Sequence, residues 1–298
     1  MNTVIENVSV IDNAQKFQDL LDIRENNTPY FFEKIFAAKS WSEKIIAKRK
    51  FKLLKKIHNQ IESMLYEDEK ICFLTSGVQQ SFVESIFLGN LAYYINRRAF
   101  ICTTHRIIII QISVGNKPMS LLAQIDYAAI DKIESKLTGK CKIKFKNGKT
   151  SIFSNMPKSD RIAIKEVIDF LRGTFNAEAP ENAGFENLCP NCFIKIEGYP
   201  AKCHTCNKEF KSVAKAAWLS FIFPGLGDLY LGSHTVFAVI EMLVMIFIWV
   251  GYFAPEKGEE PRGLLEYFIG ALIIIGLLHT FAGLGTRLIA RKGIYPVK

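Results

Sequence analysis

Four cysteines in the second half of the chain form the clearest chemical pattern in the sequence. They are arranged as two Cys-x-x-Cys pairs, Cys189 with Cys192 and Cys203 with Cys206, and ten residues separate the pairs. A pair with this spacing can present two thiolates to one ion, and two such pairs supply the four sulfur ligands that zinc takes. Because four protein ligands leave no open coordination position, the ion would hold the fold together and would not activate water.

Residues 189–212 resemble the zinc-ribbon family along their whole length, including the proline inside the first knuckle, Cys189-Pro190-Asn191-Cys192. The resemblance implies one structural zinc ion bound by the four cysteines. Two alternatives stay open: the same thiolates could coordinate iron, and a Cys-x-x-Cys pair can act as a thioredoxin-like redox couple. His204 is a further candidate ligand, although a solvent-facing side chain in the turn explains it better.

The remaining cysteines indicate a reducing compartment. Cys72, Cys102 and Cys141 occur singly in apolar or strand-like surroundings, and the odd total of seven fits a closed disulfide framework poorly. The first thirty residues are acidic and polar, without the basic start and apolar run of a secretory signal. We therefore expect the soluble part of the chain to stay in the cytoplasm.

The 298 residues carry a net charge of +9 and are 49% hydrophobic, but the apolar residues are distributed unevenly. Long, nearly uncharged stretches occur only after residue 215, which excludes a simple soluble enzyme. Residues 236–253 contain one charged residue, Glu241, and residues 264–284 contain only Glu266 and His279. Each stretch approaches the ~20 residues that span ~30 Å of hydrocarbon, so two transmembrane helices are predicted.

Residues 216–231 are apolar but contain a proline, glycines and an aspartate, which makes a straight spanning helix doubtful. We expect a re-entrant or interfacial segment. The string Pro224-Gly225-Leu226-Gly227-Asp228-Leu229-Tyr230-Leu231-Gly232 resembles the P-G-x-G-x-x-Y-x-G signature of small bacterial two-helix membrane domains. Such domains have the segment before their helices.

Flanking charges predict the orientation in the membrane. Basic residues precede the first apolar stretch and follow the last, whereas residues 254–263 between the helices contain three glutamates, one lysine and one arginine. We therefore expect the protein to lie in the inner (plasma) membrane of the cell. The positive-inside rule then places both ends of the chain in the cytoplasm. Three polar residues of the apolar segments are costly in hydrocarbon: Asp228, Glu241 and His279. A transport pathway, packing within the chain, or contacts between chains in a homo-oligomer could each explain them.

Apolar residues alternate with polar ones between residues 69 and 173, which predicts several antiparallel strands. Asn147-Gly148 predicts a hairpin with a type I′ turn, in which both residues have positive φ. The alternation places Ile143 and Phe145 inward. It places four lysines outward, Lys140, Lys142, Lys144 and Lys146. Residues 157–173 show a helical apolar stripe bounded by proline and glycine.

The segment Phe100-Ile101-Cys102-Thr103-Thr104-His105-Arg106-Ile107-Ile108 resembles the apolar-Thr-x-x-Arg-apolar strand of bacterial pleckstrin-homology-like and GRAM-like domains. The resemblance covers about a hundred residues. It implies a β-barrel plugged by a C-terminal helix, with a surface that binds lipid headgroups or a protein peptide. Residues 79–98 depart from this pattern because they are longer than a plain hairpin connection, and they could form an extra strand pair or an apolar protrusion.

The N-terminal region is predicted to be helical. Residues 1–39 indicate one or two short helices, and Ser40-Trp41-Ser42-Glu43 is a capping box that begins a longer one. This helix carries a basic block that could attract anionic lipid or nucleic acid or could simply be a solvated face. The block consists of Lys44, Lys48, Arg49, Lys50, Lys52, Lys55 and Lys56.

The expected fold class is an α+β multidomain membrane protein with N-terminal helices, a pleckstrin-homology-like β-barrel with a C-terminal helix, a zinc ribbon and a C-terminal transmembrane helical hairpin. The expected boundaries are 1–66 for the helical region, 67–173 for the barrel domain, 174–188 for a linker, 189–212 for the ribbon and 213–298 for the membrane domain.

No nucleophile–base pair, phosphate-cradling loop or open metal site is recognisable, so we expect a binding or scaffold protein and not an enzyme. The candidate lipid or partner surface comprises Lys140, Lys142, Lys144, Lys146, Lys48, Arg49 and Lys52. A membrane-tethered nucleic-acid sensor is an alternative, weakened because only Lys195 and Lys202 are basic between the cysteines. A subunit of an oligomeric channel or transporter is another.

Overall fold

The computed structural model describes residues 29–36, 38, 40–79, 91–136, 139–174, 184–232, 235–254 and 263–297. The chain divides into two compact units, one formed by Met1–Ser85 with Asn90–Leu188 and the other by Ile86–Gly89 with Cys189–Lys298. The predictions for residues 1–28, for the long connection at 80–90, for most of the linker and for the turn at 255–262 lie outside the described residues.

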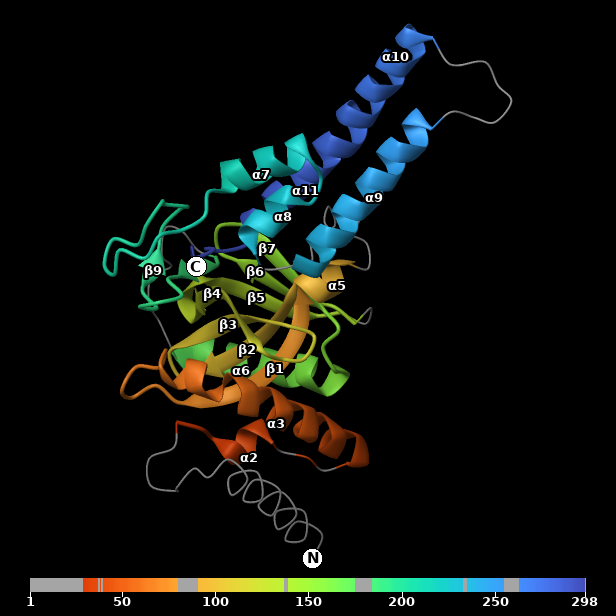
Figure 1. The fold of residues 1–298 in the computed structure, drawn as a ribbon. Helices are drawn as coiled ribbons and strands as arrows, with labels where there is room; N and C mark the ends of the chain where they lie inside the picture. The colour runs from red at the N-terminus through yellow and green to blue at the C-terminus, as the bar shows by residue number, and fades with distance from the viewer. Residues whose placement is uncertain are drawn as a thin grey trace, which may run out of the picture. The chain divides into compact units, whose positions relative to one another are not determined.

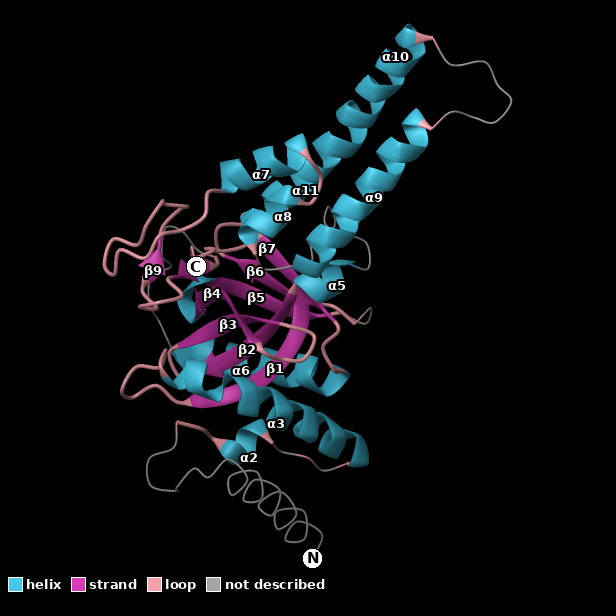
Figure 2. Ribbon diagram, in the orientation of Figure 1, coloured by secondary structure: helices cyan, strands magenta, loops and turns pink. Residues whose placement is uncertain are grey.

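The first unit combines helices with an antiparallel sheet (Figures 1 and 2). Its helices are α2 (Phe32–Ile35), α3 (Trp41–Glu62), α5 (Leu91–Ile95), the 3₁₀ turn η2 (Tyr127–Ala129) and α6 (Lys158–Thr174). Its strands are β1 (Ile71–Gln79), β2 (Arg97–Thr103), β3 (Arg106–Ile112), β4 (Pro118–Asp126), β5 (Ile130–Ser135), β6 (Cys141–Phe145), β7 (Thr150–Ser154) and β8 (Glu186–Leu188). The strands are hydrogen-bonded in the order β5-β6-β7-β1-β2-β3-β4-β8.

The predicted alternation and the capping box are both present in the structure. Cys141, Ile143 and Phe145 of β6 are buried, and the lysines between them are partly exposed. At the start of α3 the Ser40 side chain accepts a hydrogen bond from the Glu43 backbone N–H at 3.3 Å, and the Glu43 carboxylate accepts one from the Ser40 backbone N–H at 3.2 Å. The reciprocal pair satisfies two donors that the helix itself leaves unpaired.

The predicted turn type at Asn147-Gly148 is wrong. Of the two residues only Gly148 has a positive φ, 80°. The Gly148 N–H donates to the Phe145 carbonyl, and the Phe145 N–H donates to the Lys149 carbonyl, both at 2.9 Å. The loop therefore has three residues and ends in a left-handed glycine, a geometry that also matches the twist of the strands. An Asn-Gly pair supports either loop, so the dipeptide alone does not distinguish them.

The predicted linker, residues 174–188, ends in a strand. Residues 186–188 form β8, which pairs with β4 through Leu122 opposite Leu188 and Gln124 opposite Glu186. Leu188 is buried against the sheet. Three residues are too few to show an alternating pattern, and the hydrogen bonds that fix this strand come from β4, more than sixty positions away in the sequence.

The Thr-x-x-Arg motif of the sequence lies at the centre of a buried polar network. Arg106 donates from Nε to Glu69 Oε1 and from Nη2 to Glu69 Oε2, both at 3.0 Å, and both side chains are less than 10% exposed. The same guanidinium donates to the Met64 carbonyl at 2.6 Å and to Gln124 Oε1. A two-pronged ion pair of this kind is both strong and geometrically specific.

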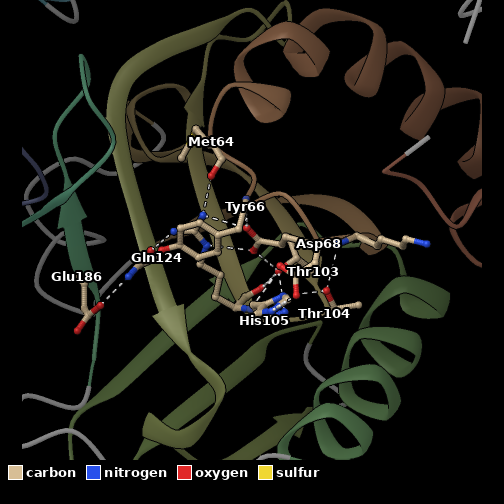
Figure 3. A network of polar contacts seen from close by, with 11 residues as sticks. Met64, Tyr66, Asp68, Thr103, Thr104, His105, Gln124 and Glu186 are labelled. Carbon is tan, nitrogen blue, oxygen red and sulfur yellow. Dashed lines mark hydrogen bonds and ion pairs between the residues drawn. The ribbon is translucent and has the colours of Figure 1, made fainter. Parts of the chain in front are cut away.

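The remaining members of the network enclose the ion pair (Figure 3). The Thr103 hydroxyl donates to Glu69 Oε1 at 2.6 Å, and the ring of Tyr66 covers the guanidinium of Arg106 at 4.1 Å. Gln124 extends the network to β8 by donating to Glu186 at 2.8 Å. Thr103 and Arg106, which the motif places three residues apart, thus act together through one carboxylate.

The second unit contains β9 (Lys195–Ile196), α7 (Val213–Ile222), α8 (Leu226–Leu231), α9 (Thr235–Phe253), α10 (Leu264–Ile274), the π-helical turn η3 (Ile275–His279) and α11 (Thr280–Ala290). Among the described residues, two helices are long and apolar enough to cross a membrane, Thr235–Phe253 with a mean hydropathy of 2.3 and Leu264–Ala290 with 2.0. Only 11% and 17% of these spans are buried, whereas the core helix of a soluble protein would be mostly covered. Their exposed apolar surface is compatible with lipid.

The segment between the cysteines and the first apolar helix is bent. α7 ends at Ile222, and α8 begins after Gly225, whose φ of 93° lies in the left-handed region. A side chain at Gly225 would also collide with the carbonyl of Ala238 on α9, since an added Cβ would lie 2.5 Å from that oxygen. The Pro-Gly break of the sequence therefore separates two short helices, neither of which is long enough to span a bilayer.

Glu69→Gln tests how much the first unit depends on the buried ion pair. The substitution leaves Arg106 without its counter-charge, and breaking one side of a buried pair costs about 3–5 kcal/mol of unfolding free energy. Asp68→Asn is the matched control, because the Asp68 side chain is 80% exposed and, among the described residues, forms an ion pair only with His105, at 3.3 Å. Pulse proteolysis across a urea series on the full chain in detergent measures both. Equal urea midpoints for the two variants would contradict the central role of the pair.

Candidate functional site

The four cysteines of the two Cys-x-x-Cys pairs come together in the structure. Their sulfur atoms all lie within 4.8 Å of one another, with Cys189 3.6 Å from Cys206 and Cys192 3.6 Å from Cys203. These separations exceed a disulfide bond of about 2.05 Å. They match the distance of about 3.8 Å between ligands that each lie ~2.3 Å from the centre of a tetrahedron. The group could therefore hold one metal ion.

Two turns with the same hydrogen bonds position the sulfurs. The N–H of Phe193 donates to the Cys189 carbonyl at 2.9 Å, and the N–H of Asn207 donates to the Cys203 carbonyl at 3.1 Å. Phe193 and Asn207 also share a left-handed backbone, with φ of 60° and 57°. Each turn reverses the chain directly after its second cysteine, which aims both thiols of a pair at the same point.

Backbone N–H groups lie beside the sulfurs. The Lys208 N–H, which points at the Cys206 sulfur, lowers the pKa of that thiol to about 6, whereas burial raises the pKa of Cys189 and of Cys192. Metals bind the thiolate form, and N–H donors at the sulfur stabilise it. His204 is exposed and is not among the four close ligands, in agreement with its interpretation as a turn residue.

The last residues of the chain complete this four-cysteine module, which we define as residues 189–211. Ile294 packs in the same small core as Ile196 and Phe210. The Lys211 N–H donates to the Tyr295 carbonyl at 2.8 Å, and the Val297 N–H donates to the Glu209 carbonyl at 2.9 Å. The spacing of the cysteines does not predict this partner. The apolar run Ile294-Tyr295-Pro296-Val297, which follows the basic end of the last helix, was the available signal.

The seven candidate residues of the lipid or partner surface lie on two elements. Lys48, Arg49 and Lys52 are exposed on α3. On the β5–β6 hairpin and its turns, Lys140 and Lys146 are exposed, and Lys142 and Lys144 are partly exposed. Glu134 of β5 lies beside this row, with its carboxylate 3.0 Å from the Lys144 ammonium and 3.4 Å from that of Lys132. The hydrogen bond from Lys144 lowers the pKa of Glu134, so the acid stays charged and offsets part of the row.

Several polar residues of the apolar segments, among them Asp228 and His279, have partners within the second unit. Thr286 of α11 donates to Asp228 of α8 at 2.8 Å and contacts the Ser220 hydroxyl of α7 at 2.8 Å. His279 Nδ1 lies 2.9 Å from the Phe221 carbonyl. These contacts join α7 and α8 to the last helix. They favour the packing interpretation of Asp228 and His279.

Close backbone approach reinforces the same junction. A Cβ atom at Gly227 would lie 2.0 Å from the Ala216 carbonyl oxygen and 2.5 Å from the Ser220 hydroxyl. The Gly227 N–H donates to that hydroxyl at 3.0 Å. Only glycine lets α8 lie this close to α7.

No known protein family, curated protein or solved structure matches the chain.

Cys203→Ser tests the metal centre. Loss of one of four thiolates is expected to abolish binding of about one metal ion per chain, because a three-sulfur site is incomplete. Elemental analysis of protein purified without chelator measures the stoichiometry, and Cys72→Ser, which removes a thiol outside the module, is expected to keep the metal. Because Ile294 shares the core of the module, amide exchange at residues 294–297 is also expected to rise in Cys203→Ser. Wild-type protein without any metal would rule out the site.

Gly227→Ala tests the packing of the bent segment. The added methyl group must displace the backbone of α7, which costs about 1–3 kcal/mol of stability by overpacking. Gly251→Ala in α9 is the control, because a Cβ at Gly251 meets nothing within 4 Å; better helix propensity makes it neutral or slightly stabilising. The temperature at which the detergent-solubilised protein aggregates reports both. An unchanged temperature for Gly227→Ala would contradict the close approach.

Proposed function

We propose that the protein is a membrane-anchored binding or scaffold protein whose first unit binds anionic lipid headgroups or a protein partner beside the membrane. The observation that carries this proposal is that the apolar helices and the basic sheet belong to different units. One unit contains both helices that are long and apolar enough to cross a membrane, and the other is a folded sheet with exposed basic residues. Both ends of the chain lie in the cytoplasm in this arrangement, as the flanking charges predict.

The first unit is proposed to be pleckstrin-homology-like. Seven consecutive antiparallel strands followed by a terminal helix support this, as does the packing of Ile164, Ile168 and Leu171 of α6 on the core. The Thr103–Arg106 motif supports it further, because both of its residues donate to one buried carboxylate, that of Glu69. β8 is an addition to the seven-strand pattern.

The metal is proposed to be zinc. Four cysteine thiolates at tetrahedral spacing favour this ion, and the small core of the four-cysteine module is too limited to fold on apolar burial alone. The module contacts the residues that follow α11. Its proposed role is therefore to hold the end of the last helix and not to carry out chemistry.

A vesicle assay with the first unit, residues 29–188, tests the lipid interpretation. This fragment includes β8, and circular dichroism first establishes that it folds. We expect it to sediment with vesicles containing phosphatidylserine or cardiolipin but not with neutral vesicles, and to be released by salt, because a lysine near an anionic surface contributes about 1 kcal/mol within a Debye length.

Two charge-matched triple variants locate the surface. The first variant reverses the charge of three lysines on and beside β6 and leaves the Lys144–Glu134 pair intact; it combines Lys140→Glu, Lys142→Glu and Lys146→Glu. The second reverses the charge of three exposed basic residues of α3; it combines Lys48→Glu, Arg49→Glu and Lys52→Glu. The triple variant that removes the lipid-binding surface is expected to bind anionic vesicles at least tenfold more weakly than the wild-type fragment. Sedimentation with neutral vesicles, or equal sedimentation of all three proteins, would contradict binding of anionic lipid by either set.

A further inference from the structure

A cavity of about 290 Å³ lies in the first unit between α3, β1 and the beginnings of β2 and α6. Its lining is polar and basic, and it includes Arg49, Lys50, Ser76, Tyr93, Arg97 and Asp160. Figure 1 shows α3 and α6 next to each other at β1, where an ion pair between Lys50 and Asp160 joins the two helices.

The only carboxylate among the lining residues is already neutralised. Asp160 is 3% exposed, and its two oxygens accept from the Lys50 ammonium at 2.8 Å and from the Thr75 hydroxyl at 2.6 Å. Lys50 also lies over the ring of Phe73 at 4.3 Å, which fixes its position. The pair therefore contributes no net charge to the lining of the cavity. The charges of the two arginines remain in excess.

Arg97 is held in place without losing its charge. Its guanidinium donates to the Val114 carbonyl at 2.6 Å and to the Asn116 side-chain oxygen at 3.0 Å, and it lies 5.9 Å from the ring of Tyr93. All of these partners are neutral. Holding a cation by neutral acceptors pre-organises it for an anion that is not part of the fold.

Arg49 is the second unpaired cation. It lies one residue before Lys50 on α3, is exposed, and forms no hydrogen bond or ion pair with any residue that the structure describes. The lysines of β6 differ, because Glu134 lies among them.

The chemistry of this lining selects the ligand. An apolar molecule would leave two guanidinium groups desolvated, which is costly, whereas the planar fork of arginine matches the oxygens of phosphate. The volume lies at the small end of the range for ligand cavities, about 300–1,000 Å³. It suits a phosphate group with a small polar body better than a nucleotide.

We propose that this cavity binds a phosphate group, carried either by a lipid headgroup or by a small soluble phosphate ester, with Arg49 and Arg97 as its cationic ligands. Ser76 supplies a hydroxyl at the wall. Arg49 also belongs to the candidate lipid surface, but a site for one phosphate group goes beyond the proposed function because it needs neither β6 nor a bilayer. Binding of glycerol 3-phosphate can therefore succeed or fail independently of sedimentation with vesicles.

Isothermal titration of the full chain in a non-ionic detergent and phosphate-free buffer tests the proposal. Glycerol 3-phosphate represents the soluble ester and dioctanoyl phosphatidic acid the lipid; glycerol and dioctanoyl glycerol are the probes without phosphate. Binding of glycerol 3-phosphate at least as tight as that of the lipid identifies the soluble source, and tighter binding of phosphatidic acid identifies the headgroup. Both phosphate-free probes are expected to show no heat of specific binding.

Arg49→Gln is the decisive variant, because Arg49 is exposed and forms no hydrogen bond or ion pair within the described part of the chain, so the substitution is expected to leave the fold intact. We expect it to weaken binding of the phosphate probe about tenfold, the usual value of one charge-assisted contact. Lys149→Gln is the matched control: it removes one exposed cation of the same unit that belongs neither to the cavity lining nor to the candidate lipid surface, and binding should stay within twofold of wild type. Arg97→Gln should weaken binding at least as much as Arg49→Gln. No binding of either phosphate probe, or equal weakening by Arg49→Gln and Lys149→Gln, would overturn the proposal.

Discussion

A guanidinium that is buried must have its donors paired, and in the first unit the donors of Arg106 determine which segments meet at β3. The Glu69 carboxylate comes from the loop before β1, the Met64 carbonyl from the end of α3, and the Gln124 oxygen from β4. Each of these groups would be left unpaired if its segment moved away, and an unpaired buried charge costs several kcal/mol. The network thus fixes the position of α3 on the sheet. The cavity beside α3 depends on that position.

The sequence was informative where the cause of a structure is local. Ser40 and Glu43 are three residues apart, and the cysteines of each pair are also three apart, so both patterns could be interpreted without knowing the fold. The strands of β6 and β7 could be predicted for the same reason, although their turn could not. By contrast, the partner of Arg106 is 37 positions away, and nothing in the motif identifies Glu69. The partner in such an ion pair can be identified only once the folded structure shows which distant residues lie together.

Two other elements were missed for the same physical reason. β8 exists because β4 offers unpaired backbone groups to three residues that have little strand propensity of their own. The residues after α11 belong to the four-cysteine module because Ile294 fills its core, and no spacing rule connects position 294 with position 196. In both cases a distant part of the chain supplies the burial. As a result, the metal ligands could be found from their own sequence, but the small core that supports them could not.

Charge balance separates the basic residues of the first unit into three kinds. Lys50 and Lys56 are engaged by the fold, the first by Asp160 and the second by the Gly115 carbonyl at 2.8 Å, so they contribute to packing. Lys144 is offset by Glu134, which leaves the row on β6 with less charge than its lysine count suggests. Arg49 and Arg97 have no acidic partner among the described residues, and they line one cavity.

Because the long-range field of a surface is screened within about 10 Å at 0.1 M salt, a diffuse row of lysines attracts many anions weakly. Two arginines in a cavity, one of them held in position by neutral acceptors, instead present a fixed geometry to a single anion, and fixed geometry is what makes recognition specific.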